Sequence, residues 1–339
     1  MRGAGRAVRQ LAGCAAPLLG ASLLGASLLG ALAPLCALAQ SVPDAAWVAD
    51  PHDLPQPYGP ASQRGALNLQ TPDTVAAALA LASRGEVVSL AVPLDRTTPA
   101  YGWRQFEVIV SQNEGTAKSN NEDYISAPIN TGTNMDGLAH MGIDGHFHGG
   151  RDGRDLQTPF GLRALGIENA GPIVARGVLL DIAALKGVDR VPIGTEITVA
   201  DVEAAMKRQG IDAIRTGDVV IFHTGHRRLL AEGRVDLYKQ GHAGPGVAAA
   251  TWLAKRGVVA VGSDSGSMEV IPNPDPDAVF PVHQTLLTLY GVHIMENLAT
   301  ERLAGASPDA GSWSTFLFVA APLPITGSSS SWISPVAIR

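Results

Sequence analysis

Apolar residues in the second half of the chain form short runs, separated by segments with helical periodicity. Strands are predicted where these runs are rich in β-branched residues, at residues 173–181, 218–223, 258–262, 292–295 and 314–320. Thr198 and Asp201 form a capping-box start for a helix that ends at Gly210. A second helix is expected over 247–256, closed by Gly257. Helices between apolar strands predict an α/β fold: one domain with a mixed, mostly buried β-sheet and flanking helices.

The first half of the chain is less regular. The expected elements are a helix over 74–83, which starts after Thr71-Pro72 and stops before Gly85, and strands over 86–94 and 106–111. Residues 40–69 carry many prolines and turn residues with almost no periodicity, which predicts an extended arm lying on the domain or on a neighbouring subunit. No repeat or linker divides residues 70–339, so we expect one domain there.

The N-terminal segment differs from the rest in composition. Three arginines precede an apolar stretch over 11–38, and Ala37-Leu38-Ala39 offers the small residues that a signal peptidase reads. Residues 1–39 are therefore interpreted as a signal peptide removed before Gln40, which predicts a secreted or periplasmic protein without stable membrane association after processing. The alternative is an uncleaved anchor, because roughly 20 apolar residues span a bilayer.

Composition excludes several classes of function. Cys14 and Cys36 both lie in the predicted leader, so the processed chain has no thiol nucleophile, thiolate ligand or disulfide. The net charge is −6 and no basic block follows the leader, so a nucleic-acid partner is not expected. The G-x-S-x-G, Walker A, H-E-x-x-H and dinucleotide motifs are missing. The segment 262–266 resembles a nucleophile elbow but carries Asp264 at its centre.

A polar, glycine-containing segment at 130–140 holds the first candidate chemistry. Asp136 and His140 are four residues apart, so one helical turn or a tight loop can bring them together. Such a pair can hold a divalent cation, or one member can bind it while the other moves protons. The alternative is a turn with surface residues. His146 and His148 follow, either as further ligands or as solvent-facing side chains.

A second group of candidate residues lies over 283–296. A helix of about eight residues from His283 carries the chain roughly 12 Å away, Gly291 reverses it, and a strand ending near Glu296 brings it back about the same distance. We therefore expect His283 and Glu296 to meet. A glutamate that ends an apolar strand is costly to bury unless it is paired or metal-bound. The alternative is local pairing of Glu296 with Arg302.

These residues together resemble the putative cyclase family, which includes bacterial kynurenine formamidase, isatin hydrolase and related cyclic amide or lactone hydrolases. The family pattern H-x-G-T-H-x-D-x-P-x-H lies over 130–140, where this chain keeps Gly132, Thr133, Asp136 and His140. Further similar segments are 217–225, 246–264 and 281–298. The resemblance spans roughly residues 87–319 and implies the cyclase-family, swivelling β/α-like fold and a homo-oligomer.

The resemblance also implies roles. Asp136, His283 and Glu296 would be metal ligands, and His140 the proton donor and acceptor. Asn130 and Asn134 stand at the two remaining metal positions, where the family has histidines. An amide oxygen is a poorer zinc ligand than an imidazole, so the number of ions stays open. The implied cofactor is a divalent metal ion, zinc or manganese.

Residues and resemblance together favour a metal-dependent hydrolase of a small, often cyclic or aromatic substrate. An arylformamidase-like enzyme would cleave an amide, formamide or lactone bond with a metal-activated water and His140 as general acid and base. Two alternatives stay open: an inactive small-molecule-binding protein of the same fold, and a metal-independent lyase or isomerase that uses His140 and Asp136. Tyr101, Trp103 and Trp252 are candidates for the pocket lining or for packing.

Overall fold

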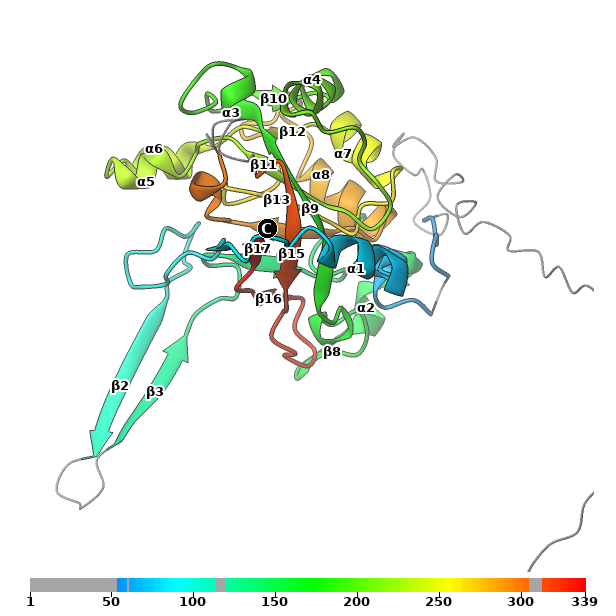
Figure 1. Cartoon of the computed structure of the whole chain (residues 1–339). Coiled ribbons are helices and arrows are strands. Elements are labelled where there is room, and N and C mark those ends of the chain that lie inside the picture. Colours follow the sequence, from blue (N-terminus) through cyan, green and yellow to red (C-terminus); the bar gives the residue numbers. More distant parts are fainter. Residues whose placement is uncertain (1–53, 60, 114–119, 305–312) are drawn as a thin grey trace, which may run out of the picture. The chain divides into compact units, whose positions relative to one another are not determined.

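A nine-stranded mixed β-sheet forms the centre of the structure, a computed structural model that describes residues 54–59, 61–113, 120–304 and 313–339 (Figure 1). The predicted signal peptide and half of the predicted arm, residues 40–53 and 60, lie outside these residues. In spatial order the strands are β1 (Val87–Ser89), β17 (Val336–Ile338), β15 (Thr315–Ala320), β9 (Ile173–Asp181), β11 (Val219–His223), β13 (Ala260–Ser263), β14 (His293–Glu296), β4 (Asn134–Asp136) and β16 (Ser330–Trp332). All belong to one unit of the chain, Cys36–Arg339.

Strands β9, β11, β13 and β14 run parallel at the middle of the sheet. All four are wholly or almost wholly buried, as expected for strands covered on both faces; β9, β11 and β13 are largely apolar, and β14 carries His293 and Glu296 at its two ends. Their bounds closely match the predicted strands. The structure confirms the predicted α/β class and mixed sheet.

Helices alternate with these parallel strands along the chain. The longer ones are α1 (Pro72–Leu79), α4 (Val199–Gln209), α7 (Val247–Ala254) and α8 (Pro281–His283), which continues into the π-helical segment η6 (Gln284–Leu289). The predicted capping box of Thr198 and Asp201 starts α4, and Gly210 ends it with φ of 68°. Helices α1 and α7 end earlier than predicted, because turns precede Gly85 and Gly257.

Short elements fill the connections. The helices are η3 (Gly65–Leu69), η4 (His148–Gly150), α2 (Gly153–Leu156), η5 (Ile167–Asn169), α3 (Ile182–Leu185), α5 (Arg228–Ala231), α6 (Val235–Gln240) and η7 (Thr300–Arg302). The two-stranded ladders pair β5 (His146–Phe147) with β6 (Arg151–Asp152), β7 (Gln157–Thr158) with β8 (Gly161–Leu162), and β10 (Glu196–Ile197) with β12 (Gly244–Pro245).

Side chains on the two faces of the sheet enter two separate cores. On β9, Val178 and Leu180 pack into the core that contains residues of α4, α7 and η6. Leu179, between them, enters the opposite core with Phe316 and Met295. This alternation follows from the two-residue period of a strand. The sheet is therefore fixed from both sides.

Antiparallel strands extend both edges, and these were harder to predict. Strand β1 is much shorter than the predicted 86–94, because its ladder with β17 ends at Ser89, opposite Val336, and the preceding Pro335 has no N–H to continue the pairing. Strands β4, β16 and β17 were not predicted. Strand β4 pairs antiparallel with β14 and lies inside the segment that was expected to be a loop or helical turn. It carries part of the candidate site into the sheet.

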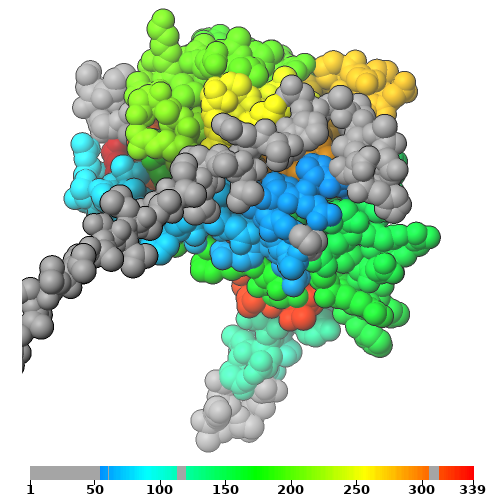
Figure 2. Space-filling model, turned by 90° about the vertical axis from the view of Figure 1, so that its right-hand side faces the viewer, coloured from blue at the N-terminus to red at the C-terminus, as the bar shows by residue number. Residues whose placement is uncertain are grey.

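A hairpin of β2 (Glu107–Asn113) and β3 (Asn120–Ser126) stands apart from the sheet (Figures 1 and 2). Strand β2 was expected and β3 was not. Both strands expose large apolar side chains, including Ile109 and Ile125. Among the described residues, no helix is long and apolar enough to cross a membrane.

The end of the predicted arm is part of the domain core. Ala66 and Leu67 of η3 are fully buried, and the Ala66 N–H donates to the Gly291 carbonyl at 2.8 Å. A Cβ on Gly65 would lie 2.3 Å from that carbonyl oxygen, so only glycine fits there. For residues 65–69 the expectation of an extended arm is wrong, because they form a helical turn that packs against the start of β14.

Candidate metal centre

Three ionisable side chains converge where β4, β14 and α8 end. Asp136 ends β4, Glu296 ends β14 and His283 ends α8. Because Asn134 pairs with Glu296 across the ladder, Asp136, two residues along, points to the same side as Glu296. One possible ligand atom from each of the three residues lies within 4.8 Å of the other two, and all three residues are buried.

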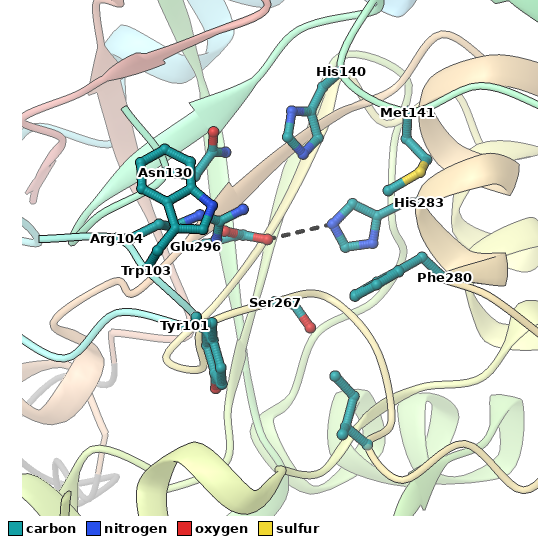
Figure 3. Close-up of a pocket in the computed structure, with 13 residues that line it drawn as sticks. Tyr101, Trp103, Arg104, Asn130, His140, Met141, Ser267, Phe280, His283 and Glu296 are labelled. Carbon is teal, nitrogen blue, oxygen red and sulfur yellow. Dashed lines mark hydrogen bonds and ion pairs between the residues drawn. The ribbon is translucent and has the colours of Figure 1, made fainter. Parts of the chain in front are cut away.

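His283 stands between the two carboxylates. Its Nε2 lies 3.3 Å from Glu296 Oε1 (Figure 3). The same nitrogen lies 3.7 Å from Asp136 Oδ2. The expected meeting of His283 with Glu296 thus takes place. Arg302, the alternative partner of Glu296, is exposed, whereas Glu296 is buried. The turn and surface interpretation of Asp136 does not hold either, because this residue is fully buried.

The amides at 130 and 134 contact the carboxylates through their nitrogen atoms. Asn130 Nδ2 donates to Asp136 Oδ1 at 2.7 Å. Asn134 Nδ2 donates to Asp136 Oδ1 at 3.3 Å and to Glu296 Oε2 at 3.4 Å. In this orientation both side chains hold the acids in place and do not present an oxygen to them. Asp136 Oδ2 and Asn134 Oδ1 are buried and have no hydrogen-bond partner among the described residues.

The charges of this cluster are strongly perturbed. Burial by itself would lower the pKa of His283, but hydrogen bonds and negative charge from Glu269 and Glu296 raise it to about 10. Burial and the nearby charge of Asp136 raise the pKa of the Glu296 carboxyl. Three buried carboxylates around one imidazole therefore leave a local excess of negative charge, which favours a cation.

These residues fit a divalent cation on two observations of this structure. The unpartnered Asp136 Oδ2 faces the same space as His283 Nε2 and Glu296 Oε1. One imidazole and two carboxylates are, in addition, a common donor set for zinc or manganese. A buried acceptor without a donor is unusual in a folded protein and requires an explanation, and a bound cation supplies one.

His140 lies beside this cluster in the turn after β4. Its Nδ1 is 3.1 Å from Ser330 Oγ, and Ser330 donates its hydroxyl proton to Asp136 Oδ1 at 3.0 Å. Since the Ser330 proton is used, His140 Nδ1 must be the donor to Ser330. A neutral His140 then carries a free lone pair on Nε2, 3.8 Å from Asp136 Oδ1. The loop geometry, and not a helical turn, brings the two residues together.

A cavity of about 400 Å³ opens onto His140, His283 and Glu296 (Figure 3). Its remaining lining residues are Tyr101, Gly102, Trp103, Arg104, Asn130, Met141, Gly266, Ser267, Ile271 and Phe280. The ring of Phe280 packs edge-on against His283, with ring centroids 5.4 Å apart. The cavity therefore joins an aromatic and apolar wall to the charged cluster, as is common for small-molecule sites.

Several sequence candidates lie elsewhere. His148 is buried and its Nδ1 donates to the Thr288 carbonyl, while His146 Nδ1 contacts the Asp144 carbonyl; neither lines the cavity. The solvent-facing expectation is wrong for His148, because the turn at Gly149 directs it toward η6.

The aromatic candidates divide into two groups. Trp252 packs against Arg256, whose guanidinium carbon lies 3.2 Å from the centre of the Trp252 ring. Tyr101 and Trp103 do line the cavity.

Four further residues in or beside the site were not predicted from the sequence. Arg104, Ser267 and Phe280 carry no spacing signal and reach the cavity only through the tertiary fold. Glu269, in contrast, could have been found from the sequence. It is an acidic residue within the apolar stretch 268–271, which is the same kind of evidence that singled out Glu296.

Comparison with solved structures supports this description of the fold. A crystal structure described as a novel cyclase superposes with a TM-score of 0.77 at 28% identity, covering 84% of this chain and 98% of that one. Isatin hydrolase A from Ralstonia solanacearum gives 0.57 at 22% identity, with 80% and 99% covered. Isatin hydrolase A from Labrenzia aggregata, bound to benzyl benzoate, gives 0.55 at 19%, with 78% and 97% covered.

A search of curated proteins found no match. The comparison with family models agrees with the comparison of structures. The family model described as "Putative cyclase" matches residues 88–270, more than half of the chain. This range includes β4, the turn that carries His140, and the central strands β9, β11 and β13. The resemblance seen in the sequence is confirmed, and the chain belongs to the putative cyclase family.

Proposed function

We propose that the protein is a metal-dependent hydrolase that cleaves an amide, formamide or lactone bond in a small, often cyclic or aromatic substrate. One observation carries the proposal: the buried Asp136, His283 and Glu296 cluster opens onto a cavity that His140 also lines, with its Nδ1 held by Ser330. The fold likeness to the isatin hydrolases supports it. The cavity suits a small molecule of one or two rings, because about 400 Å³ is near the lower limit of ligand pockets.

Asp136, His283 and Glu296 would hold the cation. When bound, a zinc or manganese ion lowers the pKa of a coordinated water and polarises the substrate carbonyl. The protein residues then have separate tasks. His140 accepts a proton at Nε2 from the attacking water and returns it to the leaving nitrogen or oxygen. Ser330 keeps the His140 ring oriented through Nδ1. Phe280 and Tyr101 confine the substrate against the cluster and limit the entry of water.

Metal analysis together with a hydrolysis screen tests the proposal. Purified protein should contain at least about one zinc or manganese ion per molecule. It should also turn over at least one member of a panel of N-formyl anilines, cyclic imides, isatins and dienelactones. Protein that never binds a divalent metal would contradict the hydrolase assignment. Metal-loaded protein that binds such compounds without turnover would favour the inactive binding protein.

We also infer that the mature protein is exported and associates with further copies of itself. The arginine-rich, apolar leader supports export, and the exposed apolar side chains of the β2–β3 hairpin support self-association.

Deletion of residues 1–39 should leave solubility and melting temperature unchanged, because this segment is a processing signal. Mass analysis of the exported protein should show Gln40 at its start; an intact Met1 would indicate an anchor. Light scattering at several concentrations measures the oligomeric state.

A further inference from the structure

Glu269 is a buried acid whose side-chain hydrogen bonds, among the described residues, all go to the segment that carries His283. It lies just outside the cavity lining, between Met268 and Val270, and is 1% exposed. Burial of a carboxylate among apolar neighbours is costly unless donors compensate it. Within the part of the chain that the structure describes, its donors come from one short segment, α8, which carries His283.

Three hydrogen bonds join Glu269 to α8. Its Oε1 accepts from the His283 backbone N–H at 2.8 Å and from His283 Nδ1 at 2.8 Å, and its Oε2 accepts from the Val282 N–H at 3.2 Å. Two of the donors are free amides at a helix start, and the third is the imidazole ring. One carboxylate thus fixes the backbone and the side chain of the same residue.

This arrangement decides which ring nitrogen is available. A carboxylate that accepts at Nδ1 keeps the proton there, so the Nε2 lone pair of the neutral ring points toward Asp136 and Glu296. A metal-bound histidine usually has such an outer carboxylate, which orients the ring and raises its basicity. The other two acids that contact His283, Asp136 and Glu296, lie near Nε2, so among the described acids Glu269 is the one on the Nδ1 side of the ring.

We propose that Glu269 is a positioning residue that sets the tautomer and orientation of His283 for metal binding. This inference rests on the proposed function. Loss of such an outer partner commonly costs 10- to 100-fold in metal affinity. Glu269→Ala should therefore weaken zinc and manganese binding by about 10- to 100-fold. Glu269→Gln keeps one acceptor oxygen but loses the charge, so its metal affinity should fall between those of the wild type and of Glu269→Ala.

A matched control separates positioning from helix capping. Asp181 is a buried acid that caps the start of α3, with its Oδ1 accepting from the Ala184 N–H at 2.9 Å, and this capping contact involves none of the three proposed ligands. Asp181→Ala and Glu269→Ala should both lower the melting temperature of the metal-free protein, but Asp181→Ala should leave the metal affinity within about threefold of the wild type.

The experiment is a competition titration of the full-length processed protein with Zn²⁺ and Mn²⁺ against a chelating dye. Nitrogen-15 NMR of the His283 ring reports the tautomer. Glu269→Ala binding as tightly as the wild type would overturn the inference and leave the hydrolase proposal intact. An equal loss in Asp181→Ala would also overturn it, because the effect would then be general damage. A wild-type protein that binds neither metal would contradict the proposed function itself and the inference with it.

Discussion

Asp136 and Asp264 are both fully buried aspartates, yet their surroundings differ in one respect. Both oxygens of Asp264 are used: Oδ1 accepts from the Thr224 N–H and hydroxyl, and Oδ2 accepts from the His226 N–H. Asp136 accepts hydrogen bonds at Oδ1, whereas its Oδ2 faces His283 and has no donor among the residues that the structure describes. The comparison teaches that burial alone does not identify a ligand-binding acid. What distinguishes it is an acceptor that the protein leaves incomplete.

The largest expected effect of this difference is on metal content. Asp136→Ala, His283→Ala or Glu296→Ala should each remove most of the bound metal and with it the hydrolytic activity, because three protein ligands leave little redundancy. Elemental analysis after dialysis and a turnover assay measure both. If His283→Ala keeps the full metal content, the ligand assignment is wrong.

Removal of His140 should separate binding from catalysis. His140→Ala should keep nearly normal metal content while kcat falls by roughly 100- to 10,000-fold, the usual contribution of one general acid-base group. Ser330→Ala should cost less, because it removes only the hydrogen bond that orients His140. A His146→Ala/His148→Ala variant provides the comparison. Metal loss in His140→Ala with normal turnover in the double variant would make His140 a ligand.

Asp264→Ala should give the opposite pattern. It leaves the donors of Thr224 and His226 without an acceptor in the core, which we expect to lower the free energy of unfolding by about 3 kcal/mol. Its metal content should match the wild type. Urea unfolding and elemental analysis of the same preparation measure the two. If Asp264→Ala loses its metal but keeps its stability, the proposed difference between Asp136 and Asp264 is wrong.

A smaller, pH-dependent effect follows from histidines that the protein keeps neutral. Burial lowers the pKa of His148 and of His242 to about 4, against about 6.5 in an unfolded chain. Below pH 6.5 the unfolded chain therefore binds more protons. The stability that each neutral histidine contributes is complete above that pH and falls as the pH drops toward 4, by at most about 1.4 kcal/mol per pH unit.

Urea unfolding at pH 7 and at pH 5 measures this loss. His148→Gln should reduce the difference between the two pH values, because Gln does not titrate. His146→Gln is the matched control, since its side chain is partly exposed. An unchanged difference in His148→Gln would contradict the prediction for His148.

The sequence by itself determined the parallel centre of the fold and most of the candidate ligands. Strands β9, β11, β13 and β14 could be predicted because each is a local apolar run whose burial needs no knowledge of its neighbours. Asp136, His140, His283 and Glu296 were found from spacing and from the resemblance. The meeting of His283 with Glu296 followed from the rise of one helix and one strand, which is again a local property.

The tertiary structure alone decided the edges of the sheet and the finer chemistry of the site. Strand β4 has the sequence Asn-Met-Asp, which has little strand preference, and only its pairing with β14 and β16 makes it a strand. Ser330, 190 positions from His140, fixes the free nitrogen of that ring. The amide orientations of Asn130 and Asn134, the cavity wall at Phe280 and the support from Glu269 likewise depend on contacts between distant segments. Such contacts follow no sequence period, because they depend on how the elements pack and not on the path of one element.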